Sequence, residues 1–324
     1  MKMKTFRFIA TVIIVVDLAT AHAQTPALTI RIKTKIVENV AKNLRETYVF
    51  PDTAIRMGDY LRHQLKSGAY DTIKSPSVFA SKLTSDILSV YPDGHLSIEY
   101  APPPIVDNQK ADQEAARAHR FKFRKTVNFG FEKAEVLQNN IGYIKINGFF
   151  PADSAAKAMT QAMLRFVSNS DALIIDLRDN MGGDPGLVSY LCSFFFAGRI
   201  HLNDLYTRKD NSTTKYWTSP DTILNPFKTM PICILTSHRT FSAGEELTYD
   251  LQTQKRATVV GETTGGGAHP VWSNAVGDGF IANIPFARAI NPITKTNWEK
   301  AGVKPDIETP ADNALDAAIK YISH

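Results

Sequence analysis

The sequence contains only two cysteines, Cys192 and Cys233, in 324 residues. Two cysteines cannot form the disulfide framework of a small secreted domain. Both lie in strongly apolar stretches, so we expect buried free thiols, with one bridge as the alternative. The sequence also lacks C-x-x-C and H-E-x-x-H motifs and any histidine–cysteine cluster, and it therefore predicts neither a metal nor another cofactor.

Dense blocks of lysine and arginine, internal repeats and low-complexity tracts are missing as well. The net charge of +5 is mild, so we do not expect nucleic acid as a partner. A hydrophobic share of 44% and a charged share of 21% are ordinary globular values, which excludes a wholly disordered chain.

The first residues read as a targeting segment. A basic start precedes an apolar run that contains Asp17 and is too short to span a bilayer, and Ala21-His22-Ala23 follows as a small-x-small cleavage pattern. We expect residues 1–23 to be a signal peptide, with a membrane anchor or an amphipathic helix as the alternative. The protein would then be exported, periplasmic or secreted, and would not span the membrane once the segment is removed.

Two regions with different patterns follow. Residues 24–115 contain three amphipathic stretches, 28–49, 52–71 and 75–92, which predict a small helical bundle. The charged, alanine-rich stretch 107–120 predicts a linker or an exposed helix.

Residues 116–324 predict an α/β domain. The apolar runs 172–178, 231–237 and 257–262 alternate with helical stretches, which favours a mainly parallel sheet covered on both faces. The loops that follow these runs are expected at one edge of the sheet, where α/β proteins bind ligands. Two of the loops are rich in glycine, but neither spells a P-loop or G-x-G-x-x-G motif, so nucleotide binding has little support.

Ser242 lies between the second of these strands and a helix. Ser242-Ala-Gly-Glu245 matches a capping box, in which the serine only satisfies a helix N–H group. The alternative is a nucleophile beside the free amides of a helix N-terminus. Thr240 stands where the G-x-S-x-G elbow has its first glycine. Gly182 and Gly183 offer further unshielded amides, or else form only a tight turn.

Four segments in order resemble one serine peptidase family: "GYIKINGFF", "ALIIDLRDNMGGDPG", "TFSAGEELTYDLQTQKRATVVGETTGGGAHP" and "EKAGVKPDIE". The family comprises the C-terminal processing (tail-specific) proteases, the tricorn core protease and interphotoreceptor retinoid-binding protein. The resemblance covers residues 141–310, and residues 27–100 resemble the N-terminal domain of the retinoid-binding-protein-like branch. It implies a crotonase/ClpP-like α/β spiral protease domain that acts on peptide or protein substrates.

The resemblance also implies roles for individual residues. Ser242 would be the nucleophile, and the N–H groups of Ala243 and of Gly182 or Gly183 would form the oxyanion hole. Processing proteases carry a lysine at the position of Gly267, so their Ser/Lys dyad cannot operate here. The 46 residues between His95 and the "GYIKING" segment are also too few for the PDZ domain of those enzymes.

The tricorn-like and retinoid-binding-protein-like branch resembles a Ser-His-Glu arrangement instead. It places His95 as the general base and Glu299 as the residue that orients it. The alternatives are a turn histidine and a solvated acid. Gly94 stands where tricorn-like enzymes have a serine, with Ser97 as a potential substitute.

Three further residues border the expected site. His269 competes with His95 as the base, although a substrate-lining or structural role is favoured. Gly266 and Gly267 are expected to line the substrate.

Two other functions use the same fold. A non-catalytic protein that binds apolar, retinoid-like or lipid-like ligands is the first alternative. A crotonase-type acyl-CoA enzyme ranks lower, because acyl-CoA chemistry is intracellular.

Overall fold

A computed structural model describes residues 28–101, 109–219 and 226–323. The expected signal peptide, residues 1–23, lies outside these ranges and remains a prediction. Within the described ranges, no helix combines the length and the apolar character needed to cross a bilayer.

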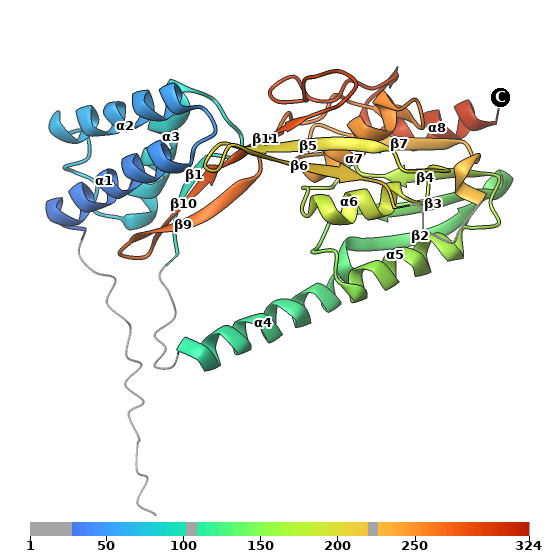
Figure 1. Ribbon diagram of the computed structural model, residues 1–324, viewed down its shortest axis with the longest axis horizontal. Helices are drawn as coiled ribbons and strands as arrows, with labels where there is room; N and C mark the ends of the chain where they lie inside the picture. Colours follow the sequence, from blue (N-terminus) through green and yellow to red (C-terminus); the bar gives the residue numbers. More distant parts are fainter. Residues whose placement is uncertain (1–27, 102–108, 220–225, 324) are drawn as a thin grey trace, which may run out of the picture.

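Three helices pack together at the N-terminal end of the described chain (Figure 1). Each carries an apolar stripe that is buried in one shared core. Proline opens the second and third helices, in the first turn where its missing N–H costs nothing. The helices confirm the predicted bundle, and their bounds are α1 (Ile30–Thr47), α2 (Pro51–Lys66) and α3 (Pro76–Val90).

A small antiparallel sheet completes this helical unit. Its strand order is β1-β10-β9, with bounds β1 (Ser97–Tyr100), β10 (Phe280–Pro285) and β9 (Val271–Gly277). Phe280, Ala282 and Ile284 enter the same core as the helices. The C-terminal half of the chain therefore supplies two strands to the helical unit.

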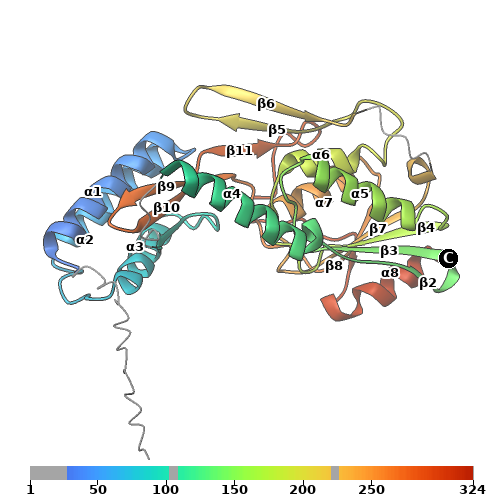
Figure 2. The same ribbon diagram turned by 90° about the horizontal axis from the view of Figure 1, so that it is seen from below.

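A long helix, α4 (Gln109–Thr126), runs from the helical unit toward the α/β part (Figure 2). It corresponds to the charged stretch predicted as a linker or an exposed helix, and its side chains from Glu114 to Phe123 are exposed. The expected domain boundary at residue 115 lies inside this helix. Together with the β9–β10 hairpin, this means that the two regions do not separate at one point of the sequence.

The α/β part is built on a six-stranded sheet of order β12-β8-β7-β4-β3-β2. All neighbouring pairs are parallel except β2–β3, which confirms the predicted mainly parallel sheet. The strand bounds are β2 (Phe131–Leu137), β3 (Ile141–Ile146), β4 (Ala172–Asp176), β7 (Ile232–Thr236), β8 (Thr258–Gly261) and β12 (Ile307–Glu308).

Helices cover both faces of this sheet. Three pack on one face and one on the other, with bounds α5 (Ser154–Phe166), α6 (Pro185–Cys192), α7 (Ala243–Thr253) and, on the opposite face, α8 (Ala314–Ile322). Cys192 is buried in the core between the sheet and α5, α6 and α7, and Cys233 in the core between the sheet and α8. Both thiols are free, in agreement with the favoured expectation.

A third sheet lies beside these layers and was not predicted. Its order is β11-β5-β6, all antiparallel, with bounds β5 (His201–Thr207), β6 (Ser212–Trp217) and β11 (Ala287–Ile290). Short 3-10 turns are η1 (Asn128–Gly130), η2 (Gln138–Asn140), η3 (Pro226–Lys228) and η4 (Ala311–Asn313).

The site follows from the order of the central strands. β4, β7 and β8 are neighbours and parallel, so the loops after them lie together at one sheet edge. These loops carry Gly182–Gly183, Ser242 and Gly266–Gly267, as the sequence pattern predicted.

Candidate active site

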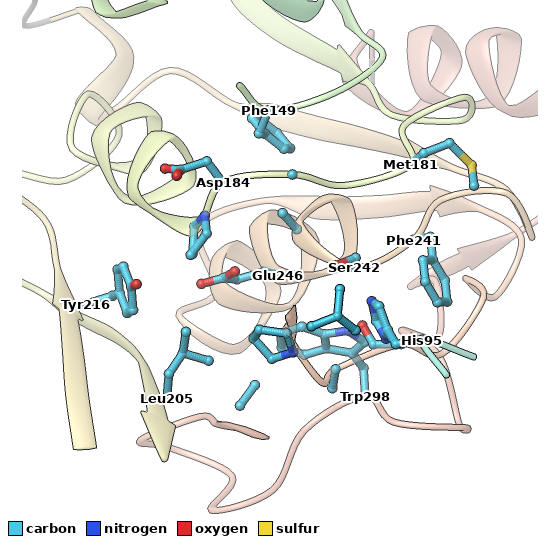
Figure 3. A pocket seen from close by; sticks show the side chains of 18 of the residues that line it. His95, Phe149, Met181, Asp184, Leu205, Tyr216, Phe241, Ser242, Glu246 and Trp298 are labelled. Carbon is cyan, nitrogen blue, oxygen red and sulfur yellow. The ribbon is translucent and has the colours of Figure 1, made fainter. Parts of the chain in front are cut away.

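Ser242 is the residue before α7 and lines a cavity of about 670 Å³ (Figure 3). Its backbone adopts φ 53° and ψ −120°, a conformation that a non-glycine residue rarely takes. Such strain persists only where surrounding contacts hold it, and it is concentrated at functional sites. The Ser242 N–H donates to Glu245 Oε2 at 2.8 Å, so the glutamate half of the capping box is present. Ser242 therefore both caps α7 and lines the cavity.

Glu245 fixes the serine loop to the glycine-rich loop. Its buried carboxylate accepts four hydrogen bonds: from Ser242 N, Thr264 Oγ1 at 2.5 Å, Gly266 N at 2.6 Å and Gly267 N at 2.8 Å. Burial raises the pKa of Glu245, while these four donors act in the opposite direction. One carboxylate therefore sets the relative position of two of the three loops.

The glycine loop after β4 approaches Ser242 closely. A Cβ atom on Gly182 would lie 2.6 Å from Ser242 Cβ, so only glycine allows this approach. The Gly182 N–H is already occupied, because it donates to Asn180 Oδ1 at 2.8 Å. The N–H groups of Gly183 and Ala243 have no acceptor among the described residues. Of the expected oxyanion donors, these two are the ones left free.

His95 reaches the cavity from the loop between α3 and β1. Its backbone N–H donates to Asp93 Oδ1 at 3.0 Å, and its ring lies against Phe241 with centroids 4.6 Å apart. Both ring nitrogens are buried and have no hydrogen-bond partner in the described chain. Burial lowers the pKa of His95 to about 4, against the opposing charge of Asp93. At neutral pH the imidazole is therefore uncharged and able to accept a proton.

Gly267 leaves no room for a side chain, such as that of a lysine, beside the His95 ring. A Cβ atom at this position would lie 2.6 Å from His95 Cε1 and would also overlap the Phe241 ring. Any side chain at residue 267 would displace the His95 ring. Glycine at residue 267 therefore leaves room for both the Phe241 and the His95 rings.

Glu299 lies beside His95 without a hydrogen bond to it. Glu299 Oε2 accepts from the Ala268 N–H at 2.8 Å, whereas Oε1 is buried and lacks a partner in the described part of the chain. Burial raises the pKa of Glu299, and the neighbouring charge of His269 lowers it. Ligand atoms of Glu299, His95 and Asp93 all lie within 4.8 Å of one another. A direct His95–Glu299 bond of about 2.8 Å needs a small approach of the two side chains.

Asp93 is a buried member of the site that the sequence did not single out. Besides the His95 N–H it accepts from Tyr48 Oη at 3.0 Å and from His269 Nδ1 at 2.8 Å. Burial raises the pKa of Asp93, but the hydrogen bonds and charges of His269 and His95 together outweigh it, and the pKa lies below its usual value. Its position two residues before His95 in the Pro-Asp-Gly-His turn was the available signal.

The other expected residues occupy different places. His269 is buried beside Asp93 and does not line the cavity. Gly266 does not line it either, whereas Gly267 does. Ser97 does not support His95, because its hydroxyl donates to Glu99 Oε1 at 3.2 Å and accepts from Asn283.

The cluster of Asp93, His95 and Glu299 is also the arrangement best suited to a metal ion among the described residues. A spacing of up to 4.8 Å is wide for three ligands of one ion, which bind at roughly 2.0–2.2 Å from the metal. Asp93 already accepts three hydrogen bonds. Metal binding would therefore need the three side chains to approach one another and Asp93 to give up hydrogen bonds that it already accepts.

Comparisons with known proteins identify the family of the chain. Residues 140–309 match Peptidase family S41, and residues 19–131 match the N-terminal domain of Peptidase_S41 in eukaryotic IRBP. Carboxyl-terminal-processing peptidase 2, chloroplastic, of Arabidopsis thaliana is 28% identical over 184 residues, which are 52% of this chain and 32% of that protein. The chain thus spans about a third of the length of this curated relative.

Solved structures share the fold. A putative peptidase from Parabacteroides merdae superposes with a TM-score of 0.63 at 18% identity, covering 90% of this chain and 97% of that one. The photosystem II D1 C-terminal processing protease gives 0.55 at 14% identity, with coverages of 90% and 97%. The tricorn protease gives 0.53 at 13%, with coverages of 90% and 37%.

These matches confirm the expected fold, a helical N-terminal unit joined to the α/β domain of such proteases. The family match spans the three loops around Ser242 and more than half of the chain. The chain belongs to peptidase family S41, a family of serine-type peptidases.

Proposed function

We propose that this protein is an exported serine endopeptidase of the C-terminal processing kind, with Ser242 as nucleophile, His95 as general base and Glu299 as the residue that orients the base. The oxyanion hole consists of the N–H groups of Gly183 and Ala243. The substrates are peptides or proteins.

Acylation would use these groups as follows. The neutral His95 imidazole takes the hydroxyl proton of Ser242 as Oγ bonds to the scissile carbonyl carbon. The two free N–H groups stabilise the resulting oxyanion. The imidazolium then gives its proton to the departing nitrogen, the C–N bond breaks, and an ester on Ser242 remains.

Deacylation uses the same groups in reverse. His95 takes a proton from water while the water oxygen bonds to the ester carbon. The bond from that carbon to Ser242 Oγ breaks, Oγ recovers the proton from the imidazolium, and a carboxylic acid leaves. A carboxylate close to the ring stabilises the imidazolium in both steps, which is the part that Glu299 would play.

One observation carries this proposal. A serine in a strained backbone conformation lines one cavity with a buried imidazole and two N–H groups that have no partner among the described residues. A serine that only capped a helix would need none of the other three. Gly267, which makes room for the His95 ring, is a further feature that a cap alone does not require.

The test compares the protein with its Ser242→Ala variant. We expect a fluorophosphonate probe to label the protein and not the variant, and hydrolysis of a peptide library to fall by roughly 10⁴-fold or more. Thermal melting of both proteins controls for folding. Equal labelling, or equal hydrolysis, would refute the assignment of Ser242.

The alternative of a non-catalytic carrier for apolar ligands draws support from the cavity walls, which are mostly apolar and aromatic. It predicts a lipid or retinoid-like ligand that copurifies with the protein, and no reaction with the acylating probe. The same labelling experiment therefore separates the two functions. Export is tested separately, by comparing the N-terminal residue of the protein from the cell envelope with Gln24.

A further inference from the structure

The cavity extends well beyond the reacting groups. From Ser242 it runs away from His95, toward Glu246 and Tyr216 (Figure 3). Its walls include the side chains of Leu205, Trp298 and Phe286. Apart from His95, the titratable residues in the lining are Asp184, Glu246 and Tyr216; no lysine or arginine of the described chain lines it. The acids of this mostly apolar cavity therefore have no cationic side chain in the described lining to pair with.

Glu246 is the more buried of the two carboxyl groups in the lining. It lies four residues after Ser242 on α7, so a helical rise of about 6 Å separates them. The residue is only 5% exposed, yet it lines the cavity. Oε1 accepts from Asn203 Nδ2 at 3.1 Å, while Oε2 has no hydrogen-bond partner in the described ranges. A buried carboxylate with one unpaired oxygen facing a cavity is costly unless a ligand satisfies it.

The surroundings increase this cost. Asp184 lines the same cavity, and its Oδ1 accepts from the Leu187 N–H at 3.1 Å. Asp250 lies one turn further along α7, is buried, and has no partner on either carboxyl oxygen among the described residues. Burial raises the pKa of Asp250 well above its usual value, and the neighbouring Glu246 acts in the same direction. Of these two acids on α7, only Glu246 lines the cavity, so it is the one that a ligand can reach.

We infer that this cavity is the S1 pocket of the peptidase and that Glu246 selects a lysine or arginine side chain at P1. The inference rests on the proposed function, since it takes Ser242 as the point of attack. The aliphatic stem of such a side chain would pack between the apolar walls, as the stems of long cations commonly do. Its charged end would meet Glu246 Oε2, with Asp184 adding to the negative potential. Tyr216 beside Glu246 offers an aromatic face to the same cation.

The experiment uses peptide substrates that differ only at P1: lysine, arginine, and norleucine, which has a similar chain without the charge. We expect kcat/KM for lysine to exceed that for norleucine by roughly 10²-fold, the size of effect found when a buried charge pair forms. In Glu246→Gln the ratio should fall to within about threefold of one. Glu308→Gln, which alters an exposed glutamate on β12, is the matched control and should keep the ratio.

A binding measurement makes the inference independent of turnover. Labelled peptides ending in lysine or norleucine are titrated into Ser242→Ala and into Ser242→Ala/Glu246→Gln. Tighter binding of the lysine peptide by the first variant, lost in the second, supports the inference even if no peptide is cleaved. Equal binding of the two peptides by Ser242→Ala, or a preference for norleucine, overturns it. If the fluorophosphonate probe does not label the unmodified protein, the proposed function is refuted instead.

The pH dependence adds a second readout. Burial raises the pKa of Glu246 to about 7, with Asp184 acting in the same direction and Asn203 against it. Asp250, Cys192 and Tyr216 are the other titratable groups in its electrostatic surroundings. The lysine-to-norleucine ratio of kcat/KM should therefore rise between pH 6 and pH 8. A ratio that stays constant over this interval would contradict the role of Glu246.

Discussion

The two halves of the candidate site differ in how completely they are hydrogen-bonded. On the Ser242 side, Glu245 accepts four hydrogen bonds and locks the serine loop to the glycine-rich loop. On the His95 side, both ring nitrogens and Glu299 Oε1 are buried without partners in the described chain. The nucleophile half is thus preassembled, and the base half is left open.

This difference corresponds to the origin of the residues. Ser242, Glu245 and the glycine loop all come from one sheet edge, whereas His95 comes from the helical unit. A base on a separate unit can approach Glu299 and Ser242 when the two units shift slightly. The open half is therefore where substrate binding could complete the site, and the predictions below test each half.

Removing the base should have the largest effect. We expect His95→Ala to lower kcat/KM for peptide hydrolysis by roughly 10³-fold, because a general base contributes about 10²–10⁴-fold. The melting temperature should change little, since neither ring nitrogen forms a hydrogen bond with a described residue. Activity within threefold of the unmodified protein would assign the base to another residue, with His269 next to be tested.

Removing the Glu245 carboxylate should destabilise the Ser242 side of the site. Glu245→Ala leaves the Thr264 hydroxyl and three N–H groups without an acceptor. We expect the free energy of unfolding to fall by about 3 kcal/mol, as an unsatisfied buried polar group costs about 1–3 kcal/mol. Urea denaturation measures the change, with Glu308→Ala on the surface as control. A loss below 1 kcal/mol would mean that the loops hold their positions without this carboxylate.

Neutralising Glu299 should have a smaller effect on rate. Glu299→Gln removes the charge that stabilises the imidazolium, and we expect kcat to fall by roughly 10²-fold with KM little changed. The change is confined to the His95 side of the site, so the free energy of unfolding measured by urea denaturation should be almost unchanged. A variant with full kcat would leave Asp93, which touches the His95 backbone, as the acid that supports the base.

The acid limb of the pH profile should show the smallest and most specific effect. Because burial lowers the pKa of His95 to about 4, the base stays uncharged until the pH falls well below its usual 6.5. For the norleucine substrate, which does not need an ionised Glu246, we expect kcat/KM to decline only as the pH approaches 4, with Asp93, His269 and Glu299 as the groups facing the ring. The same depression removes stability as the pH falls from 6.5 through 4, since the unfolded histidine binds a proton more readily. An acid limb near 6.5 would show that the ring is solvated.

Much of the site could be predicted from local patterns. Apolar runs followed by loops identified β4, β7 and β8 and placed Ser242 and the two glycine loops together, because parallel strands end at a common edge. Asp93 was missed since its three partners come from residues as distant as Tyr48 and His269. The sheet of β11, β5 and β6 was missed too, and with it the wall of the cavity.

The sequence by itself determined the helical bundle, the mainly parallel sheet and the family, because these depend on apolar periodicity and on motifs that are contiguous along the chain. Only the tertiary structure decided that Gly183 rather than Gly182 has an N–H group without an acceptor among the described residues, and that a side chain at residue 267 would meet the His95 and Phe241 rings. It alone brought Glu246 to the inner part of the cavity. Such features depend on distances between segments remote in sequence, and hydrogen bonds and steric exclusion act only across those distances.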